Sequence, residues 1–304
     1  MIKNFEDVLD LAKSRGPKTL SVAVAQDKEV LMAVNESGKM GIADAILVGD
    51  RKEIIKIAEE INMDVSKYEI IDIIDPVKAS RRAVELVSTG KAHIVMKGLV
   101  DTSVILKAVL DGEIGLRTGN ILSHVAVFGV DTYHKLLLVT DAAMNIEPDL
   151  GQKKQIIENA VYLAHSIDIE EPKVAVVCAK EKINPKMPAT VDAGQLVDAN
   201  EKGEIKACIV GGPFALDNAI SKEAAIHKGI DHPVAGDADI ILTPNIESGN
   251  VLYKALAFLA RSKNAGIIVG AKAPIVLTSR ADNDEAKLNS IALGVLMASK
   301  NEGE

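Results

Sequence analysis

Short apolar runs rich in Val and Ile alternate with helical segments along almost the whole chain, and this alternation constrains the fold more than any other feature. Because the runs are apolar on both faces, they are typical of strands in a parallel sheet that helices cover on both sides. The predicted strands begin at Leu20, Ala45, Tyr68, Ala92, His124, Lys135, Lys173, Lys206, Ala238, Ala265 and Pro274. The sequence therefore predicts an α/β fold with mainly parallel sheets.

Two neighbouring runs follow a different pattern. Only residues 129–135 separate His124–Phe128 from Leu136–Val139, and this connection is too short for a helical crossover. We therefore expect an antiparallel hairpin at this point. The chain has 304 residues, about twice the length of a usual domain, and the polar stretch Asp141–Gly151 is the best candidate for a domain boundary.

Composition excludes several classes of function. The chain carries 35 Lys and Arg against 43 Asp and Glu, and its net charge of −8 argues against a general nucleic-acid or anionic-membrane binder. Aromatic residues make up 3% of the chain, which argues against stacking platforms for bases or sugars. Cys178 and Cys208 lie inside apolar runs, so we expect buried, reduced thiols rather than a disulfide or a zinc site. The sequence shows neither a signal-peptide core nor an apolar run of membrane length, so we expect a cytoplasmic protein.

Small and polar residues gather where the predicted strands end, which is where ligands bind to parallel sheets. These endings are Met96–Thr102, Thr140–Asn145, Gly211–Asp217, Thr243–Asn250 and Thr278–Asp284. The sequence contains no Walker-type GxxxxGK[ST] loop, no dinucleotide fingerprint after the first strand, no HExxH and no GxSxG. We therefore expect positioned Arg, Lys and Ser side chains, with backbone amides, around a small anionic substrate.

Two basic positions are candidates for binding a phosphate. Ser279 and Arg280 follow the strand 274–277 directly, and a hydroxyl beside a guanidinium can hold a phosphate or acyl-phosphate oxygen. The alternative is a helix cap and a surface Arg. Arg117 lies between two glycines that allow close backbone approach to a ligand, or in an ordinary turn.

Other strand ends offer further candidates, each with a structural alternative. Lys97 and Gly98 precede a predicted helix start, where Lys97 would face an anion or only solvent. Gly211, Gly212 and Pro213 predict a tight turn into a helix, with amides that can form an anion-binding concavity. Asp217 would lie one turn inside that helix, as a site residue or a favourable first-turn acid, and Asn250 would lie near a later helix start.

Six blocks, in order, resemble the phosphate acetyl/butyryltransferase family. They are MKGLVDT, GLRTGNILSHVAVF, INPKMPATVDA, GGPFALDNAIS, TPNIESGNVLYK and VLTSRADNDEAKLNSIAL. The resemblance covers nearly the whole chain. It implies the reversible transfer of a short-chain acyl group, with butyryl expected, between CoA and inorganic phosphate, without a metal or other cofactor.

The resemblance also implies an architecture. It implies two α/β/α domains of the isocitrate/isopropylmalate dehydrogenase-like kind, with the active site in the cleft between them and the last helix packed on the first domain. Residues 1–140 plus 280–304 would form the first domain and residues 141–279 the second. A homo-oligomer is expected.

Some site residues carry over from the family by position. Ser279 and Arg280 match a Ser-Arg pair implicated in orienting CoA or phosphate and the developing oxyanion, and Arg117 matches a phosphate-binding candidate. We also assign Thr118 and Ser123, in the same block as Arg117, to substrate binding. Acetyl-transferring members place an Asp seven residues after the Ser as the base for the CoA thiol, but this chain has Ala286 there. Glu285 or Asp282 would replace it, or the butyryl-transferring branch would use another group.

Three alternatives remain open on sequence grounds. The acyl group can be acetyl, propionyl or branched, because one methylene contributes only about 1–3 kcal/mol of discrimination. A decarboxylating dehydrogenase of related fold would need more metal-binding carboxylates than Asp237 and Asp239 supply. A catalytically silent CoA-binding protein would bind CoA without phosphate-dependent turnover, and Ala286 is the sequence feature that favours it.

Overall fold

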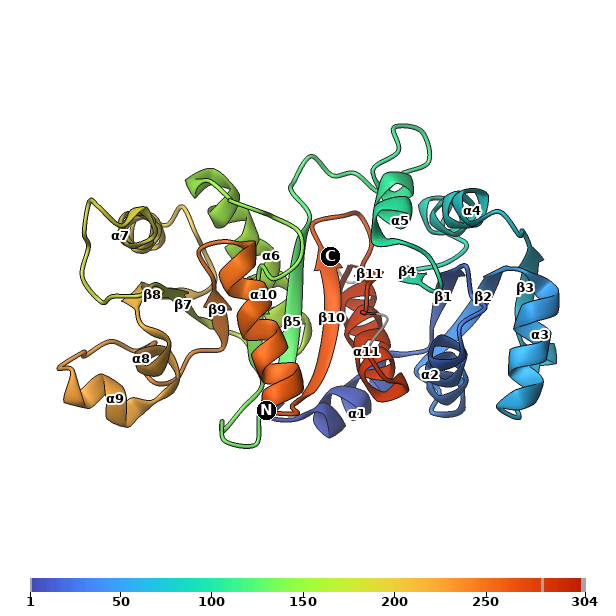
Figure 1. Ribbon diagram of the computed structural model, residues 1–304, viewed down its shortest axis with the longest axis horizontal. Helices are drawn as coiled ribbons and strands as arrows, with labels where there is room; N and C mark the ends of the chain where they lie inside the picture. The colour runs from blue at the N-terminus through green and yellow to red at the C-terminus, as the bar shows by residue number, and fades with distance from the viewer. Residues whose placement is uncertain (1, 280–281, 302–304) are drawn as a thin grey trace. The chain divides into compact units, whose positions relative to one another are not determined.

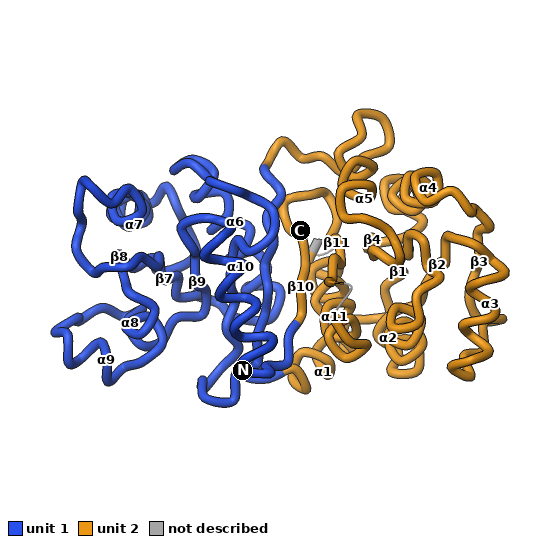
Figure 2. Tube along the Cα trace, viewed as in Figure 1, with its two compact units in different colours: residues 1–4, 121–264 blue, residues 5–120, 265–304 orange. Residues whose placement is uncertain are grey.

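The computed structural model describes residues 2–279 and 282–301, which form two compact units. Unit 1 comprises residues 1–4 and 121–264, and unit 2 comprises residues 5–120 and 265–304, as Figure 2 shows. All eleven segments predicted as strands contain strands. The α/β class with mainly parallel pairing is therefore confirmed.

Unit 2 contains a sheet with the strand order β3-β2-β1-β4-β11-β10. Its strands are β1 (Lys18–Ala23), β2 (Ala43–Gly49), β3 (Glu69–Asp72), β4 (Ile94–Lys97), β10 (Lys263–Val269) and β11 (Ile275–Val276). Neighbouring strands are parallel except β10, which pairs antiparallel with β11. The carboxyl ends of β1 to β4 and of β11 therefore meet at one edge of this sheet.

Helices cover both faces of the unit 2 sheet (Figure 1). They are α1 (Phe5–Arg15), α2 (Lys28–Lys39), α3 (Arg51–Glu60), α4 (Pro76–Ser88), α5 (Thr102–Val109) and α11 (Asp284–Asn301), with a short 3-10 turn, η1, at Val65–Lys67. Figure 1 shows α4 and α5 on one face of β1 to β4, and α2 and α3 on the other. The last helix, α11, packs against α1 and α2, which agrees with the expectation that the chain's end returns to the first domain.

Unit 1 contains strands in the order β5-β6-β9-β7-β8. Their bounds are β5 (Ser123–Gly129), β6 (Leu137–Thr140), β7 (Lys173–Val177), β8 (Ile209–Phe214) and β9 (Ile240–Leu242). β5 pairs antiparallel with β6, so the predicted hairpin is confirmed, and the other pairs are parallel. Because β6 also pairs with β9, the hairpin belongs to unit 1.

The helices of unit 1 also lie on two faces. They are α6 (Leu150–Ser166), α7 (Pro188–Glu201), α8 (Leu216–Ile220), α9 (Lys222–His227) and α10 (Ile246–Lys254), with a π-helical turn at Ala255–Leu259. A buried cluster joins β5, β6, β7 and β9 to α8, α9 and α10; Phe128 and Tyr253 lie in it with their rings 5.4 Å apart. In the described part of the chain, the structure shows no helix long and apolar enough to cross a membrane.

Candidate active site

Lys97 and Ser279 leave the unit 2 sheet at the same edge. β4 and β11 are parallel neighbours, with Met96 opposite Val276, so the residues that follow each strand emerge side by side. Lys97 is only 5% exposed, and its Nζ donates 3.3 Å hydrogen bonds to the carbonyl oxygens of Gly98 and Val100. The structure thus brings together two of the predicted site residues.

Gly98 is required by packing at this edge. A Cβ there would lie 2.2 Å from the carbonyl oxygen of Val24, and the amide of Gly98 donates to the carbonyl oxygen of Ala23 at 2.8 Å. Any larger residue would therefore separate the turn after β4 from the turn after β1. This contact explains the glycine without a ligand.

Two hydrogen bonds join Ser279 to Asp282. The Ser279 amide donates to Oδ2 of Asp282 at 2.7 Å, and the Asp282 amide donates to the carbonyl oxygen of Ser279 at 3.2 Å. The buried Lys287 donates from Nζ to the carbonyl oxygen of Asp282. Arg280 lies outside the described residues, so its predicted role stays a prediction.

The position where acetyl-transferring relatives were expected to place their base lies in the first turns of α11. Ala286 is 6% exposed, and its amide donates to Oδ1 of Asn283 at 2.9 Å. Glu285, beside it, is exposed. The carboxylate of Asp282 accepts the Ser279 amide and Asp282 is half-buried, so Glu285 is the more exposed of the two residues predicted to replace the base.

Arg117 and Thr118 are anchored elsewhere in unit 2. Both are exposed; Thr118 Oγ1 donates to the carbonyl oxygen of Gly270 at 2.6 Å, and the Lys272 amide donates to the carbonyl oxygen of Leu116 at 2.8 Å. These contacts tie the Arg117 loop to the turn between β10 and β11. Ser279 follows the other end of β11, so the structure does not group Arg117 with Ser279.

Three helices of unit 2 are closed at their N-termini by aspartates. The carboxylates of Asp27, Asp50 and Asp75 accept hydrogen bonds from the first-turn amides of α2, α3 and α4. Within the described residues, Asp101 at the start of α5 makes no such bond to its own helix. The first amides of α5, which follow Lys97 and Gly98 in the chain, are therefore not capped by Asp101 and can bind an anion.

In unit 1, Asp141 organises the carboxyl end of β6. The carboxylate is 3% exposed; Oδ1 accepts the amides of Ala143 and Met144 at 2.8 and 2.9 Å, and Oδ2 accepts the amide and the side-chain Nδ2 of Asn145 at 3.2 and 2.6 Å. One buried side chain thus fixes the whole turn 142–145.

Asn250 rests on that turn. It lies in α10, is exposed, and donates from Nδ2 to the carbonyl oxygen of Ala142 at 3.2 Å. The approach of α10 depends on Gly249, where a Cβ would lie 2.3 Å from the carbonyl oxygen of Asp141. The predicted site residue Asn250 is therefore placed at the carboxyl end of β6.

The expected turn at Gly211, Gly212 and Pro213 is wrong. All three residues lie within β8, and the following helix begins at Leu216, so Pro213 is not its first residue. The register of β8 on β7 shifts across Gly212 and Pro213, and the pairing resumes at Phe214, whose carbonyl oxygen accepts the Cys178 amide at 2.7 Å. A Cβ at Gly211 would lie 2.6 Å from the His232 ring, and a Cβ at Gly212 would lie 2.9 Å from the carbonyl oxygen of Val176.

Asp217 takes part in a charged cluster in the first turn of α8. Lys228 Nζ lies 3.0 Å from Oδ2 of Asp217 and 2.7 Å from Oε1 of Glu181, which also accepts from the buried Asn218 at 2.8 Å. Hydrogen bonds from Lys228 and Asn218 lower the pKa of Glu181 to about 2. Asp217 is therefore held through Lys228 beside the loop that follows β7.

Ser123 and His124 are buried at the start of β5. The Ser123 hydroxyl accepts from Asn159 Nδ2 at 2.9 Å and is not open to solvent. The His124 ring packs edge-on against Tyr253, with centroids 6.0 Å apart. These contacts agree with the structural alternative for His124 and give Ser123 a packing role in this structure.

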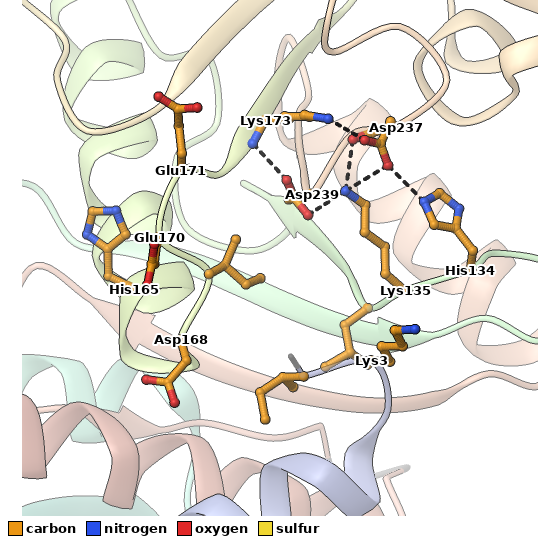
Figure 3. Close-up of a pocket in the computed structure, with 13 residues that line it drawn as sticks. Lys3, His134, Lys135, His165, Asp168, Glu170, Glu171, Lys173, Asp237 and Asp239 are labelled. Atoms are coloured by element: carbon orange, nitrogen blue, oxygen red, sulfur yellow. Dashed lines mark hydrogen bonds and ion pairs between the residues drawn. The ribbon is translucent and has the colours of Figure 1, made fainter.

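A cavity of about 1150 Å³ opens at the other edge of the unit 1 sheet. Figure 3 shows Lys135 between Asp237 and Asp239; its Nζ lies 3.0 and 2.6 Å from their carboxylates. Lys173 and His134 also bind Asp237. Burial acts to raise the pKa of Asp237, but hydrogen bonds from Lys173, Lys135 and His134 outweigh it and hold the pKa well below its usual range.

This network joins the amino ends of β6, β7 and β9, because Lys135, Lys173 and Asp239 precede or begin these strands. It lies at the opposite ends of the strands from Asp141 and Asn250, so we assign it to stability. Across the described ranges, the structure holds no group of three or more His, Cys, Asp or Glu side chains arranged for a metal ion.

Comparison with known proteins supplies the family. The model of the phosphate acetyl/butaryl transferase family matches residues 4–81 and 74–295. The chain belongs to this family. It is 56% identical to a phosphate butyryltransferase of Clostridium acetobutylicum, over 98% of this chain and 99% of the relative. It is 52% identical to a phosphate butyryltransferase of Clostridium beijerinckii, over 99% and 100% of the two chains.

A solved structure agrees with this family assignment. The branched-chain phosphotransacylase from Enterococcus faecalis matches with a TM-score of 0.81 and 35% identity, over 92% of this chain and 99% of that chain. Two features of this chain were not predicted as functional from the sequence: Asp141 and the loop before α7. Asp141 was included only as part of a strand ending, although an Asp directly after a strand and before small residues is a signal for such a turn. The loop before α7 was quoted as a family block, but no residue in it was assigned a role.

Proposed function

We propose that this chain catalyses the reversible transfer of a butyryl group between CoA and inorganic phosphate. The observation that carries this function is the identity of 56% and 52%, over nearly the full length of each chain, to two proteins named phosphate butyryltransferase. The chain is accordingly an acyltransferase, with CoA, short-chain acyl-CoA and inorganic phosphate as its substrates.

We propose a direct transfer in a ternary complex. The CoA thiolate attacks the carbonyl carbon of butyryl phosphate, a C–S bond forms, and the tetrahedral intermediate collapses with cleavage of the C–O bond, whose electron pair leaves with phosphate. A thiol with an ordinary pKa of about 8.5 needs a base or a positive field to ionise near neutral pH. No covalent enzyme intermediate is required.

The strand ends of unit 2 suit the phosphate and the oxyanion. Ser279 or a nearby amide would hold the oxyanion, and Arg280 would neutralise the leaving phosphate. Arg117, on the loop tied to the turn between β10 and β11, stays a predicted ligand of a phosphate group, either the transferred phosphate or one of CoA. Lys97 beside the open amides of α5 supports an anion site at the same edge.

We assign the base to Glu285. The residue expected to match the family Asp is the buried Ala286, and Asp282 is half-buried, whereas Glu285 is exposed in the first turn of α11. An exposed carboxylate can accept the thiol proton directly or through one water.

Several finer expectations stay predictions. They are an isocitrate/isopropylmalate dehydrogenase-like fold with an interdomain active site, turnover without a cofactor, a homo-oligomeric state, and a cytoplasmic location. The acyl preference is also open to test: acetyl and branched acyl groups are the other candidates, because the chain is 46% identical to a phosphate acetyltransferase of Thermotoga maritima and 35% identical to a branched-chain phosphotransacylase.

The deciding experiment is phosphate-dependent release of the CoA thiol. Purified protein, treated with a chelator, is incubated with phosphate and either butyryl-CoA, isobutyryl-CoA or acetyl-CoA, and the free thiol is measured. Faster release from butyryl-CoA supports the proposal, and faster release from another acyl-CoA keeps the chemistry but changes the substrate. Binding of CoA without any release would contradict the enzymatic function.

A further inference from the structure

We propose that the loop between β7 and α7, residues 178–187, binds the phosphate groups at the nucleotide end of CoA. The proposal rests on the proposed function and names a part of its binding site. The loop carries Lys180, Lys182 and Lys186, all exposed. Among the described residues, no acidic side chain pairs with any of these three lysines.

The surroundings of the loop are positively charged, although the chain is acidic overall. The acid inside the loop, Glu181, is bound to Asn218 and Lys228, and Lys228 also binds Asp217. On the neighbouring helix, Asp192 is bound by the buried Lys153 at 2.6 Å. The three loop lysines, Lys228 and Lys153 carry five positive charges, and Glu181, Asp217 and Asp192 carry three negative charges. The group therefore has an excess of two positive charges, in a chain whose net charge is −8.

The loop is held in one shape by the first turn of α7. The buried Thr190 accepts the Asn184 amide at Oγ1, at 2.9 Å, and donates to the carbonyl oxygens of Asn184 and Met187. The Lys186 amide donates to the Asn184 side chain at 3.0 Å. A loop fixed in this way loses little conformational entropy when it binds a ligand.

An apolar side chain lies among the lysines. Ile183 is 59% exposed, and it packs on Gly194 of α7, where a Cβ would lie 2.6 Å from its Cδ1. Inorganic phosphate has no apolar surface that could be buried against Ile183. A nucleotide, in contrast, combines phosphates with a base ring and a ribose. The mixture of lysines and Ile183 therefore favours the nucleotide end of CoA, which bears a ribose 3′-phosphate and a diphosphate.

The loop also lies at the correct edge of the unit 1 sheet. It follows the carboxyl end of β7, where the Cys178 amide binds the carbonyl oxygen of Phe214 at the carboxyl end of β8. Asn250 lies at the same edge, beside β6. A CoA phosphate bound to the lysines would therefore lie at the edge where ligands bind to parallel sheets.

The test replaces the three lysines together by glutamine, K180Q/K182Q/K186Q. We expect KM for CoA, with butyryl phosphate as co-substrate, to rise about tenfold, the size expected for losing three exposed ion pairs. KM for phosphate and kcat should stay within twofold of the wild type. Wild-type protein should prefer CoA over 3′-dephospho-CoA, and the variant should lose much of this preference. A matched variant, K52Q/K202Q/K206Q, removes three exposed lysines outside the loop and should match the wild type.

Each other outcome has a definite meaning. An unchanged KM for CoA would overturn the proposal, and a rise in KM for phosphate alone would show that the lysines serve free phosphate instead. Calorimetric binding of CoA to the wild type and the variant repeats the comparison without turnover. If the wild type shows no phosphate-dependent release, the proposed function fails, while the calorimetry still reports on the loop.

Discussion

The side chain of Asn250 donates a hydrogen bond to the carbonyl oxygen of Ala142, 108 residues earlier in the chain, at 3.2 Å. That carbonyl belongs to the turn that the buried carboxylate of Asp141 holds closed through four hydrogen bonds. Asp141 therefore positions Asn250 without facing the ligand edge itself. The turn after β6 therefore holds Asn250, a predicted residue of the site, in place.

Replacing Asp141 by Asn should weaken both stability and activity. The amide nitrogen of Asn would face the two donors of Asn145, so we expect the free energy of unfolding to fall by about 1–3 kcal/mol. Because Asn250 loses its support, kcat should fall more than the KM values rise. Denaturant unfolding and steady-state kinetics measure the two effects.

The control for this variant is Asp149→Asn, which weakens the capping box at the start of α6. It should lower stability by about 1 kcal/mol with near-normal kinetics. An Asp141→Asn protein with wild-type kinetics would show that the turn does not act on the site.

Removing the Ser279 hydroxyl or the Arg280 guanidinium should slow turnover without unfolding the protein. Loss of one oxyanion or phosphate donor costs about 10²–10³ in kcat, so Ser279→Ala and Arg280→Ala should each fall in this range. Thermal unfolding checks the fold, and Ser66→Ala, at an exposed serine in η1, is the control. Near-normal kinetics of Arg280→Ala would remove Arg280 from the site.

Asp237→Asn should destabilise the protein in a pH-dependent way. The folded-state pKa of Asp237 is lowered, so its contribution is complete above about pH 4 and is lost as the pH falls further. We expect a loss of about 1 kcal/mol at pH 7, since the side chain is partly exposed. The difference in melting temperature should narrow below pH 4, and Asp131→Asn, at an exposed site, should show no such trend. A difference that grows on acidification would contradict this assignment.

The two cysteines should be unreactive in the native protein. Burial raises the pKa of Cys178 to about 11 and that of Cys208 to about 12, so both are thiols at pH 8. A thiol reagent should therefore label native protein slowly and label both residues at once in denaturant. Fast labelling of one cysteine per chain in the native protein would contradict the burial of the two thiols. Such a thiol would also interfere with the thiol-release assay.

The fold was largely predictable because its signals are local. Apolar runs such as the one beginning at Lys173 mark buried strands wherever they pair, and the short connection at residues 129–135 leaves little choice but a hairpin. Gly212 and Pro213 predicted a turn because this dipeptide is typical of turns, whereas here it forms an irregularity inside β8, and the pairing with β7 resumes at Phe214.

The site was less predictable because its contacts join distant parts of the chain. Asn250 meets Ala142, and Lys97 meets the Ser279 edge, only after β4 pairs with β11 and α10 packs on β6. Asp141 is the exception, since its partners lie within four residues and the sequence carried the signal. Charge balance in the loop 178–187 depends on Lys228 and could not be seen from the loop alone.

The aspartates that close α2, α3 and α4 limit what this scaffold can evolve to bind. Each places a fixed negative charge where a related α/β fold could receive a nucleotide phosphate. A variant that gained a new cofactor at Asp27, Asp50 or Asp75 would first have to lose its cap, at a cost of about 1 kcal/mol per helix for Asp→Ala. Selection for a nucleotide site at the start of α2, α3 or α4 would therefore have to cross a loss of stability before any new affinity appeared.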